Sequence, residues 1–160
     1  MMSAKIIKNF LEPDLITFLE KKFLYDVPHN YGHVSDSNDS NAINFYNSNI
    51  NANDTMIDFI IKKLKQHFTF REVLRSYINV QHYKMDGNWH TDDGALTLLL
   101  MITKTLKKGE GCFQIKENDN ITSYDFEQNT LIGFNAKLLH RGLAPNSVND
   151  IRITLAFKTR

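Results

Sequence analysis

The sequence predicts a mainly β, α+β domain in which two helices precede roughly seven short strands. Three observations support this fold class. Apolar residues repeat with helical spacing in two early stretches, the spacing changes to a period of two after Val73, and turn-like stretches separate the later apolar runs. Many short strands after a helical start are typical of a sandwich or jelly roll with helices packed outside it.

The composition is that of an ordinary globular chain. Its 160 residues fit one domain spanning residues 1–160, and hydrophobic residues make up 42% of it. A formal net charge of +1 argues against nucleic acid as a partner. Cys112 is the only cysteine, so no internal disulfide can form, which fits a reducing compartment. No apolar run reaches the roughly 20 residues that span a membrane, and no signal-peptide core is present. We therefore expect a cytoplasmic protein without a membrane partner.

Two helices are predicted, each with a start signal. The first follows a short alternating strand over residues 5–10 and opens at Pro13, because proline in the first helical turn loses no hydrogen bond. The second follows Asn53, Asp54 and Thr55, which together can cap it. The apolar stripes are Leu15, Ile16, Leu19 and Phe23 in the first helix, and Ile57, Ile60, Ile61, Leu64 and Phe68 in the second. The cations expected on the solvated face of the second helix are Lys62, Lys63 and Lys65.

Residues 26–54 have a different composition, rich in Asn, Ser and Asp, with short apolar islands at Val34 and over residues 43–46. We expect loops there with one or two short strands. A plain surface connection and a rim beside a functional site both fit this composition.

From Val73 onward the pattern is that of strands. A strand over residues 77–83 would place Tyr77, Asn79, Gln81 and Tyr83 on one face. Residues 96–102 are continuously apolar, which is typical of a strand buried on both faces. The remaining predicted strands cover residues 112–115, 121–126, 130–134 and 151–157.

His90 and Asp92 form a His-x-Asp pair. In an extended backbone both side chains point the same way, whereas the neighbouring Asp93 points the other way. An imidazole and a carboxylate on one face are two thirds of the 2-His-1-carboxylate set that binds non-haem Fe(II). His140, which follows a predicted strand, fits as the second histidine. The histidines without such a partner spacing are His29, His33, His67 and His82.

Five segments carry a family resemblance. They are residues 6–16, residues 81–92 with Tyr, Gly and His-x-Asp, residues 108–114 with a Gly-rich turn and Cys112, residues 134–140 with the distal His, and residues 151–157 with the closing strand. In this order they resemble the 2-oxoglutarate and Fe(II)-dependent dioxygenases, with the prolyl-hydroxylase-like branch nearest. The resemblance implies a double-stranded β-helix, a jelly-roll or cupin-like fold, with the two helices packed outside. Residues 30–36 resemble small phage-encoded members, for which the compartment would be the host cytoplasm.

The resemblance also implies the ligands of the site. The residues that would hold Fe(II) are His90, Asp92 and His140, with no further catalytic residue. The residues that would bind the co-substrate 2-oxoglutarate are Arg152, Tyr83, Thr154 and Gln81. Arg152 would pair with the remote carboxylate, because a planar guanidinium offers two parallel donors. Dioxygen would be consumed, and ascorbate would serve as a reductant.

The implied function is hydroxylation of a C–H bond with release of succinate and CO2, and a peptidyl proline is the first substrate hypothesis. An AlkB-type nucleic-acid oxygenase is one alternative, since residues 152–158 resemble that branch's Arg-x-Asn-Leu-Thr-Phe-Arg ending, although Thr154 and Lys158 depart from it. A small-molecule hydroxylase is another, and a non-enzymatic jelly roll that binds a metal or a partner is the third.

Two further expectations concern the approach to the site. Part of residues 29–48 is expected to border the iron pocket and to order when substrate binds. Arg71, Arg75 and Lys137 are candidates for substrate contact, but solvated surface charges are the interpretation we prefer for all three.

Overall fold

The computed structural model describes residues 4–51 and 53–160, which form two α-helices, one π-helical turn and ten strands. In chain order these are β1 (Ala4–Ile7), α1 (Pro13–Lys21), the π-helical turn η1 (Lys22–Asp26), β2 (Asn30–His33), β3 (Phe45–Asn49), α2 (Thr55–Leu64), β4 (Val73–Gln81), β5 (Leu96–Met101), β6 (Phe113–Glu117), β7 (Asn120–Tyr124), β8 (Leu131–Asn135), β9 (Leu139–Gly142) and β10 (Arg152–Thr159).

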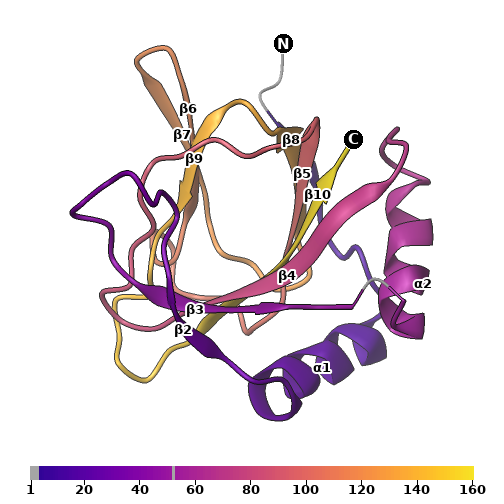
Figure 1. The fold of residues 1–160 in the computed structure, drawn as a ribbon. Coiled ribbons are helices and arrows are strands. Elements are labelled where there is room, and N and C mark those ends of the chain that lie inside the picture. Colours follow the sequence, from indigo (N-terminus) through magenta and orange to yellow (C-terminus); the bar gives the residue numbers. More distant parts are fainter. Residues whose placement is uncertain (1–3, 52) are drawn as a thin grey trace.

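The strands form two antiparallel sheets. The larger has the order β1-β8-β5-β10-β4-β3-β2 and the smaller has the order β7-β6-β9. Figure 1 shows the smaller sheet opposite β5, β8 and β10, while both helices lie outside the larger sheet. This arrangement confirms the predicted fold class, a mainly β jelly roll with two external helices.

Alternation along β4, β5 and β10 creates two cores. Outward-facing residues of these strands, such as Ile78, Leu100 and Phe157, are fully buried against the helices. Inward-facing residues, such as Leu99, pack in a second cluster with Phe113 of the smaller sheet. Each fully buried side chain of this size contributes about 1.5–3 kcal/mol through the hydrophobic effect. The prediction that residues 96–102 are a strand buried on both faces is therefore confirmed for β5.

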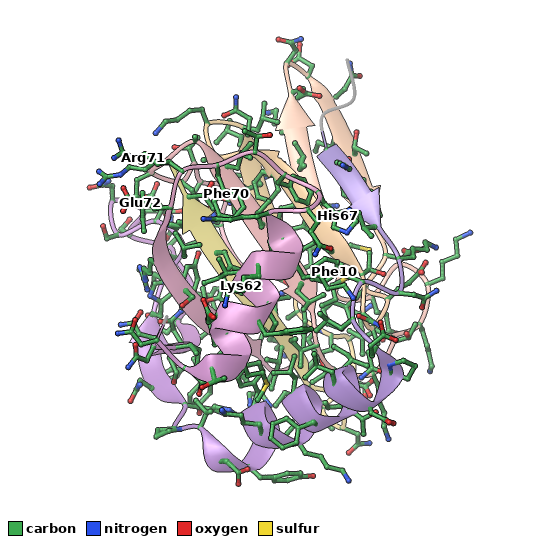
Figure 2. All side chains as sticks on the ribbon, turned by 90° about the vertical axis from the view of Figure 1, so that its right-hand side faces the viewer. Phe10, Lys62, His67, Phe70, Arg71 and Glu72 are labelled. Carbon is green, nitrogen blue, oxygen red and sulfur yellow. The ribbon has the colours of Figure 1, made fainter. Side chains whose placement is uncertain are left out.

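Helix α2 starts and packs as its sequence predicts. The Asp54 side chain accepts hydrogen bonds from the backbone N–H groups of Met56 and Ile57 at 2.9 and 3.3 Å. Figure 2 looks onto α2, with Lys62 on its exposed face and Arg71 and Glu72 at the upper left, in the segment that leads into β4. Lys63 departs from the expected solvated face.

The position of Lys63 has a simple physical reason. Its ammonium group lies 3.6 Å from Glu12 and over the Phe10 ring at 5.6 Å, so the side chain bridges α2 to the turn before α1. The side chain is consequently half-buried rather than solvated.

Strand boundaries differ most from expectation at β4 and β9. The strand predicted over residues 77–83 starts earlier, at Val73, and stops at Gln81, because a turn closed by the Met85 N–H and the His82 carbonyl follows at once. Strand β9 was not predicted from the sequence. Two strands, β2 and β3, occur within residues 26–54, as expected. None of the described helices has the length and apolar character that crossing a membrane requires.

Candidate active site

Three side chains with metal-ligating atoms converge between the sheets. One ligand atom from each of His90, Asp92 and His140 lies within 4.8 Å of the other two. His90 Nε2 is 3.8 Å from Asp92 Oδ1, and His140 Nε2 is 3.5 Å from Asp92 Oδ2. The trio that the sequence predicts is thus brought together.

A single β-bridge positions the two histidines. The His90 N–H donates to the His140 carbonyl at 3.1 Å, and the His140 N–H donates to the His90 carbonyl at 2.9 Å. His140 belongs to β9, whereas His90 precedes β5, so the bridge joins segments far apart in the chain.

A hydrogen bond at Nδ1 fixes the orientation of each histidine ring. His90 Nδ1 lies 2.9 Å from the Asn88 carbonyl, and His140 Nδ1 lies 2.8 Å from the Leu138 carbonyl. Because a carbonyl can only accept, each Nδ1 carries the proton, and each Nε2 keeps a lone pair directed at the cluster. Burial lowers the pKa of His90, which favours the neutral form that ligates metals.

Asp92 is held as a buried carboxylate. Burial by itself raises its pKa, but the charge of Lys158 and the hydrogen bond from the Thr97 hydroxyl hold the pKa below its ordinary value. Thr97 donates to Oδ2 at 2.7 Å, and the Lys158 ammonium lies 3.0 Å from Oδ1. Its neighbour Asp93 is 85% exposed at the rim of the cavity, where Lys158 contacts it.

The trio lines a cavity of about 260 Å³ between the two sheets. Its floor is the inner face of β4 and β10, where the register pairs Arg152 with Gln81, Thr154 with Asn79, and Ala156 with Tyr77. Both Arg152 and Thr154 are almost wholly buried on this floor.

Arg152 is a buried cation without an acidic partner in the described part of the chain. Its Nε donates to the Gly111 carbonyl at 2.9 Å, and its Nη1 donates to Gln81 Oε1 at 2.6 Å. Burial lowers the pKa of Arg152 to about 10, so the guanidinium remains charged at neutral pH. An isolated buried charge is costly, and such groups are normally paired.

Two donors beside this charge lack acceptors. Arg152 Nη2 and Thr154 Oγ1 are buried and have no hydrogen-bond partner among the described residues. Buried donors are almost always satisfied, so an orphaned pair on one cavity floor indicates the position of an absent acceptor. Gly142 keeps this space open, because a Cβ there would lie 3.0 Å from both Nη1 and Nη2.

The two other residues predicted to bind the co-substrate differ from each other. Gln81 lines the cavity and orients Arg152 through the contact with Nη1. Tyr83 is not among the cavity residues and is 41% exposed, with the Lys84 ammonium over its ring. The expectation that Tyr83 shares the face of Gln81 is wrong, because β4 ends at Gln81 and the turn that follows, with Lys84 at φ 67°, redirects the chain.

Sequence reasoning missed other residues of the cavity wall. Lys158 lies on the same face of β10 as Arg152, and Arg75 lies on the same face of β4 as Tyr77 and Gln81. In both strands the even spacing puts the cation on the face of a predicted site residue. For Arg75 we preferred the interpretation of a solvated surface charge. Burial and the Asp92 charge raise the pKa of Tyr77, so its phenol stays neutral.

Part of the long irregular stretch also borders the cavity. We call residues 33–45 the strap, because His33, Val34, Ser35 and Phe45 line the cavity. Asn88, whose carbonyl orients His90, donates from its side chain to Asp39 of the strap. The expectation that residues 29–48 border the pocket is confirmed, whereas ordering on substrate binding stays a prediction.

Solved structures, but no sequence matches, resemble this protein. No family model and no curated protein matches the sequence. Among solved structures, a prolyl-4-hydroxylase from Pseudomonas putida has a TM-score of 0.78 at 11% identity, covering 99% of this chain and 93% of that one. A viral collagen prolyl hydroxylase from Paramecium bursaria Chlorella virus-1, solved with 2-oxoglutarate, has a TM-score of 0.69 at 17% identity, with coverages of 98% and 94%.

A third similar structure is a prolyl hydroxylase from Trichoplax adhaerens, solved with a peptide fragment of the hypoxia inducible factor. It has a TM-score of 0.75 at 14% identity and covers 98% of this chain and 84% of that one. With two antiparallel sheets around a cavity and helices outside the larger one, the chain has the double-stranded β-helix fold of the 2-oxoglutarate and Fe(II)-dependent oxygenases.

Proposed function

We propose that this protein is a 2-oxoglutarate- and Fe(II)-dependent oxygenase that hydroxylates a C–H bond and releases succinate and CO2. The observation that carries the proposal is the pairing of two features in one cavity. Three converging metal ligands lie on one side of it, and a buried, unpaired arginine with two orphaned donors lies on the floor.

The residues fit both absent groups. Two neutral imidazoles and a carboxylate are the ligand set of non-haem Fe(II) sites and leave positions open for other ligands. A buried guanidinium beside a free hydroxyl suits one carboxylate of a dicarboxylic acid. A Cβ at Gly142 would lie 3.0 Å from the Arg152 guanidinium, and Gly142 is two positions beyond His140 on β9. Same-face residues of a strand lie roughly 6–7 Å apart, a span that a five-carbon diacid can bridge.

Each residue then has a defined task. His90, Asp92 and His140 would hold the metal, with the Asn88 and Leu138 carbonyls fixing the two rings. Thr97 would keep the Asp92 carboxylate oriented. Outer hydrogen bonds of this kind commonly account for about 10–100-fold in metal affinity.

The co-substrate would be oriented by the cavity floor. Arg152 and Thr154 would bind its remote carboxylate, and Gln81 would hold the guanidinium in place. When bound, Fe(II) with 2-oxoglutarate and dioxygen supplies the oxidant for the C–H bond, and ascorbate would keep the metal reduced. The apolar wall that includes Leu99, Phe113 and Phe134 would limit the entry of water.

We propose a peptidyl proline as the prime substrate. The similarity to three prolyl hydroxylases, one of them solved with a peptide fragment, supports this choice. A nucleic-acid substrate has less support, because the formal net charge is only +1. A small-molecule substrate is the remaining alternative, and the experiments below include it.

The decisive test of the reaction is succinate release from 2-oxoglutarate with Fe(II) and ascorbate. Proline-containing peptides, single-stranded oligonucleotides and free amino acids are screened as prime substrates. We expect a peptide to stimulate succinate release and to gain 16 Da, the mass of one oxygen atom. Succinate release that is absent in every arm, or unchanged in the Asp92→Ala variant, would contradict the proposal.

The metal site has its own test. Crystals soaked in Mn(II) should show anomalous density at ligand distances of roughly 2.0–2.2 Å from His90, Asp92 and His140. Density elsewhere, with these side chains free of metal, would contradict the assignment whatever the turnover assay shows.

A further inference from the structure

The charges that line the cavity do not cancel. Arg75, Arg152 and Lys158 are cationic, and Asp92 and Asp93 are acidic. Lys158 contacts both acids, at 3.0 and 2.9 Å, whereas Arg75 and Arg152 make no ion pair in residues 4–51 and 53–160. The proposed function gives Arg152 a partner, since the remote carboxylate of 2-oxoglutarate would face it.

Arg75 is still uncompensated when both absent groups are counted. A divalent metal would add two positive charges and 2-oxoglutarate would remove two, so the cavity would keep its net charge of one unit. Arg152 and Lys158 would each have a carboxylate, which leaves Arg75 as the cation without one.

The contacts of Arg75 orient its guanidinium without neutralising it. Its Nε donates to Asn49 Oδ1 at 3.1 Å, and its Nη2 donates to Asn47 Oδ1 at 3.4 Å. The guanidinium carbon lies 4.3 Å from the centre of the Tyr77 ring. All three partners are uncharged, and Nη1 has no acceptor among the described residues. An arginine held in this way is ready to offer parallel donors to an oxyanion.

Arg75 lies on the cavity wall beside the strap. It sits on the inner face of β4, opposite Lys158 of β10 in the register. The side chain of His33, from the strap, lines the same part of the cavity. Burial, and after it the charges of Arg75 and Lys158, lowers the pKa of His33, since both cations lie near its ring.

Arg71 is the natural comparison. It lies four positions earlier, is exposed, and pairs with Glu72 at 3.0 Å, outside the cavity. Figure 2 shows Arg71 and Glu72 together at the edge of the molecule. Arg71 has the properties of an ordinary surface charge, whereas Arg75 lacks an acid and lines a cavity.

We infer that Arg75 binds an anionic group of the prime substrate, a carboxylate or a phosphate, and thereby selects substrates that carry a negative charge near the hydroxylated carbon. The inference rests on the proposed function, and it specifies the substrate class of the same cavity. For a peptide substrate the group would be an acidic side chain or the chain terminus beside the proline.

The test follows the arginine Nε–H signals by NMR, in protein loaded with Zn(II) and saturated with 2-oxoglutarate. The probes are acetate, inorganic phosphate and, as a neutral match for acetate, acetamide. We expect a saturable shift at Arg75 with an anion, half-complete below about 10 mM, and no saturable shift with acetamide or at Arg71. The anion that shifts Arg75 identifies the group as a carboxylate or a phosphate.

Variants separate binding from structural damage. In Arg75→Gln, the side-chain amide signal of Asn79, which also lines the cavity, should lose its response to the anion. Arg75→Lys should keep part of the response, and Arg71→Gln should keep all of it. An Arg75 signal that no anion saturates, or an equal response to acetamide, overturns the inference.

The same sample distinguishes this inference from the proposed function. Titration with 2-oxoglutarate should first shift the Nε–H signal of Arg152. If Arg152 does not respond, the proposed function is wrong. If Arg152 responds and Arg75 never binds an anion, only the present inference is wrong.

Discussion

Arg152 and Lys158 occupy the same face of β10, six positions apart, and both line the cavity. Lys158 contacts two carboxylates, those of Asp92 and Asp93, while Arg152 contacts only the neutral acceptors of Gly111 and Gln81. One cation is satisfied by the protein and the other is not. An unpaired buried charge thus marks a ligand position, whereas a paired one maintains the geometry of its partner.

The strongest test of this comparison is Arg152→Gln. Removing the guanidinium leaves the bound carboxylate without its cation, which should cost on the order of 2–5 kcal/mol of 2-oxoglutarate affinity. Mn(II) affinity should stay within about threefold, because Arg152 touches none of the metal ligands. Calorimetric titration measures both quantities, and Arg71→Gln is the control. Equal 2-oxoglutarate affinity in wild type and Arg152→Gln would mean that Arg152 does not bind it.

Lys158→Met tests the paired cation. The loss of its contact with the buried Asp92 should lower the free energy of unfolding by about 1.5–3 kcal/mol without metal. With Mn(II) bound the loss should be smaller, since the metal supplies the positive charge instead. Urea denaturation with and without Mn(II) gives both numbers. The same loss in both conditions would show that Lys158 acts through packing rather than charge.

Gln81→Leu tests how much the orientation of Arg152 matters, because it removes the acceptor of Arg152 Nη1. The guanidinium loses its 2.6 Å contact but keeps the Gly111 carbonyl. We expect 2-oxoglutarate affinity to fall about 5–10-fold, the effect of roughly one hydrogen bond. Titration of 2-oxoglutarate into both proteins measures it. A loss as large as that of Arg152→Gln would show that Gln81 contacts the co-substrate directly.

The smallest effect on either ligand should come from deleting residues 36–41 of the strap. These residues do not line the cavity, whereas His33 and Phe45 at the two ends of the strap do. The deletion also removes Asp39, which contacts the Asn88 side chain, but the Asn88 carbonyl that orients His90 stays in place. Metal and 2-oxoglutarate affinities should therefore be unchanged within about threefold, while turnover of the prime substrate changes. Succinate release with and without the prime substrate separates the two effects. Unchanged turnover would mean that the strap is only a connection.

Local patterns sufficed for much of the fold. The apolar stripe of α2 with its Asp54 cap and the doubly buried β5 follow from periodicity, which packing reinforces. Strand β9 could not be predicted in this way. Its four residues contain a glycine and alternate poorly, and pairing with β6 stabilises them from a distance.

In the candidate site, too, some residues are predictable from local spacing and others depend on distant strand pairing. His90 and Asp92 are close in sequence, so alternation brings them together, and the family pattern supplies His140 and Arg152. The prediction for Tyr83 was wrong because β4 ends at Gln81, and the turn that follows moves Tyr83 off the face that Gln81 occupies. Even spacing places Arg75 and Lys158 on the strand faces of Gln81 and Arg152, but that these faces line a cavity depends on long-range strand pairing.

The β-bridge between His90 and His140 affects how the site can bind, lose and exchange its metal. Two of the three ligands are tied to each other by backbone hydrogen bonds that need no ion. Metal binding should therefore order little of the chain, in contrast to zinc fingers, which fold only when loaded. A chelator should strip the ion while the fold persists, so that oxidised or mismatched metal can be exchanged repeatedly. The metal-free protein would then keep its fold and bind the metal again.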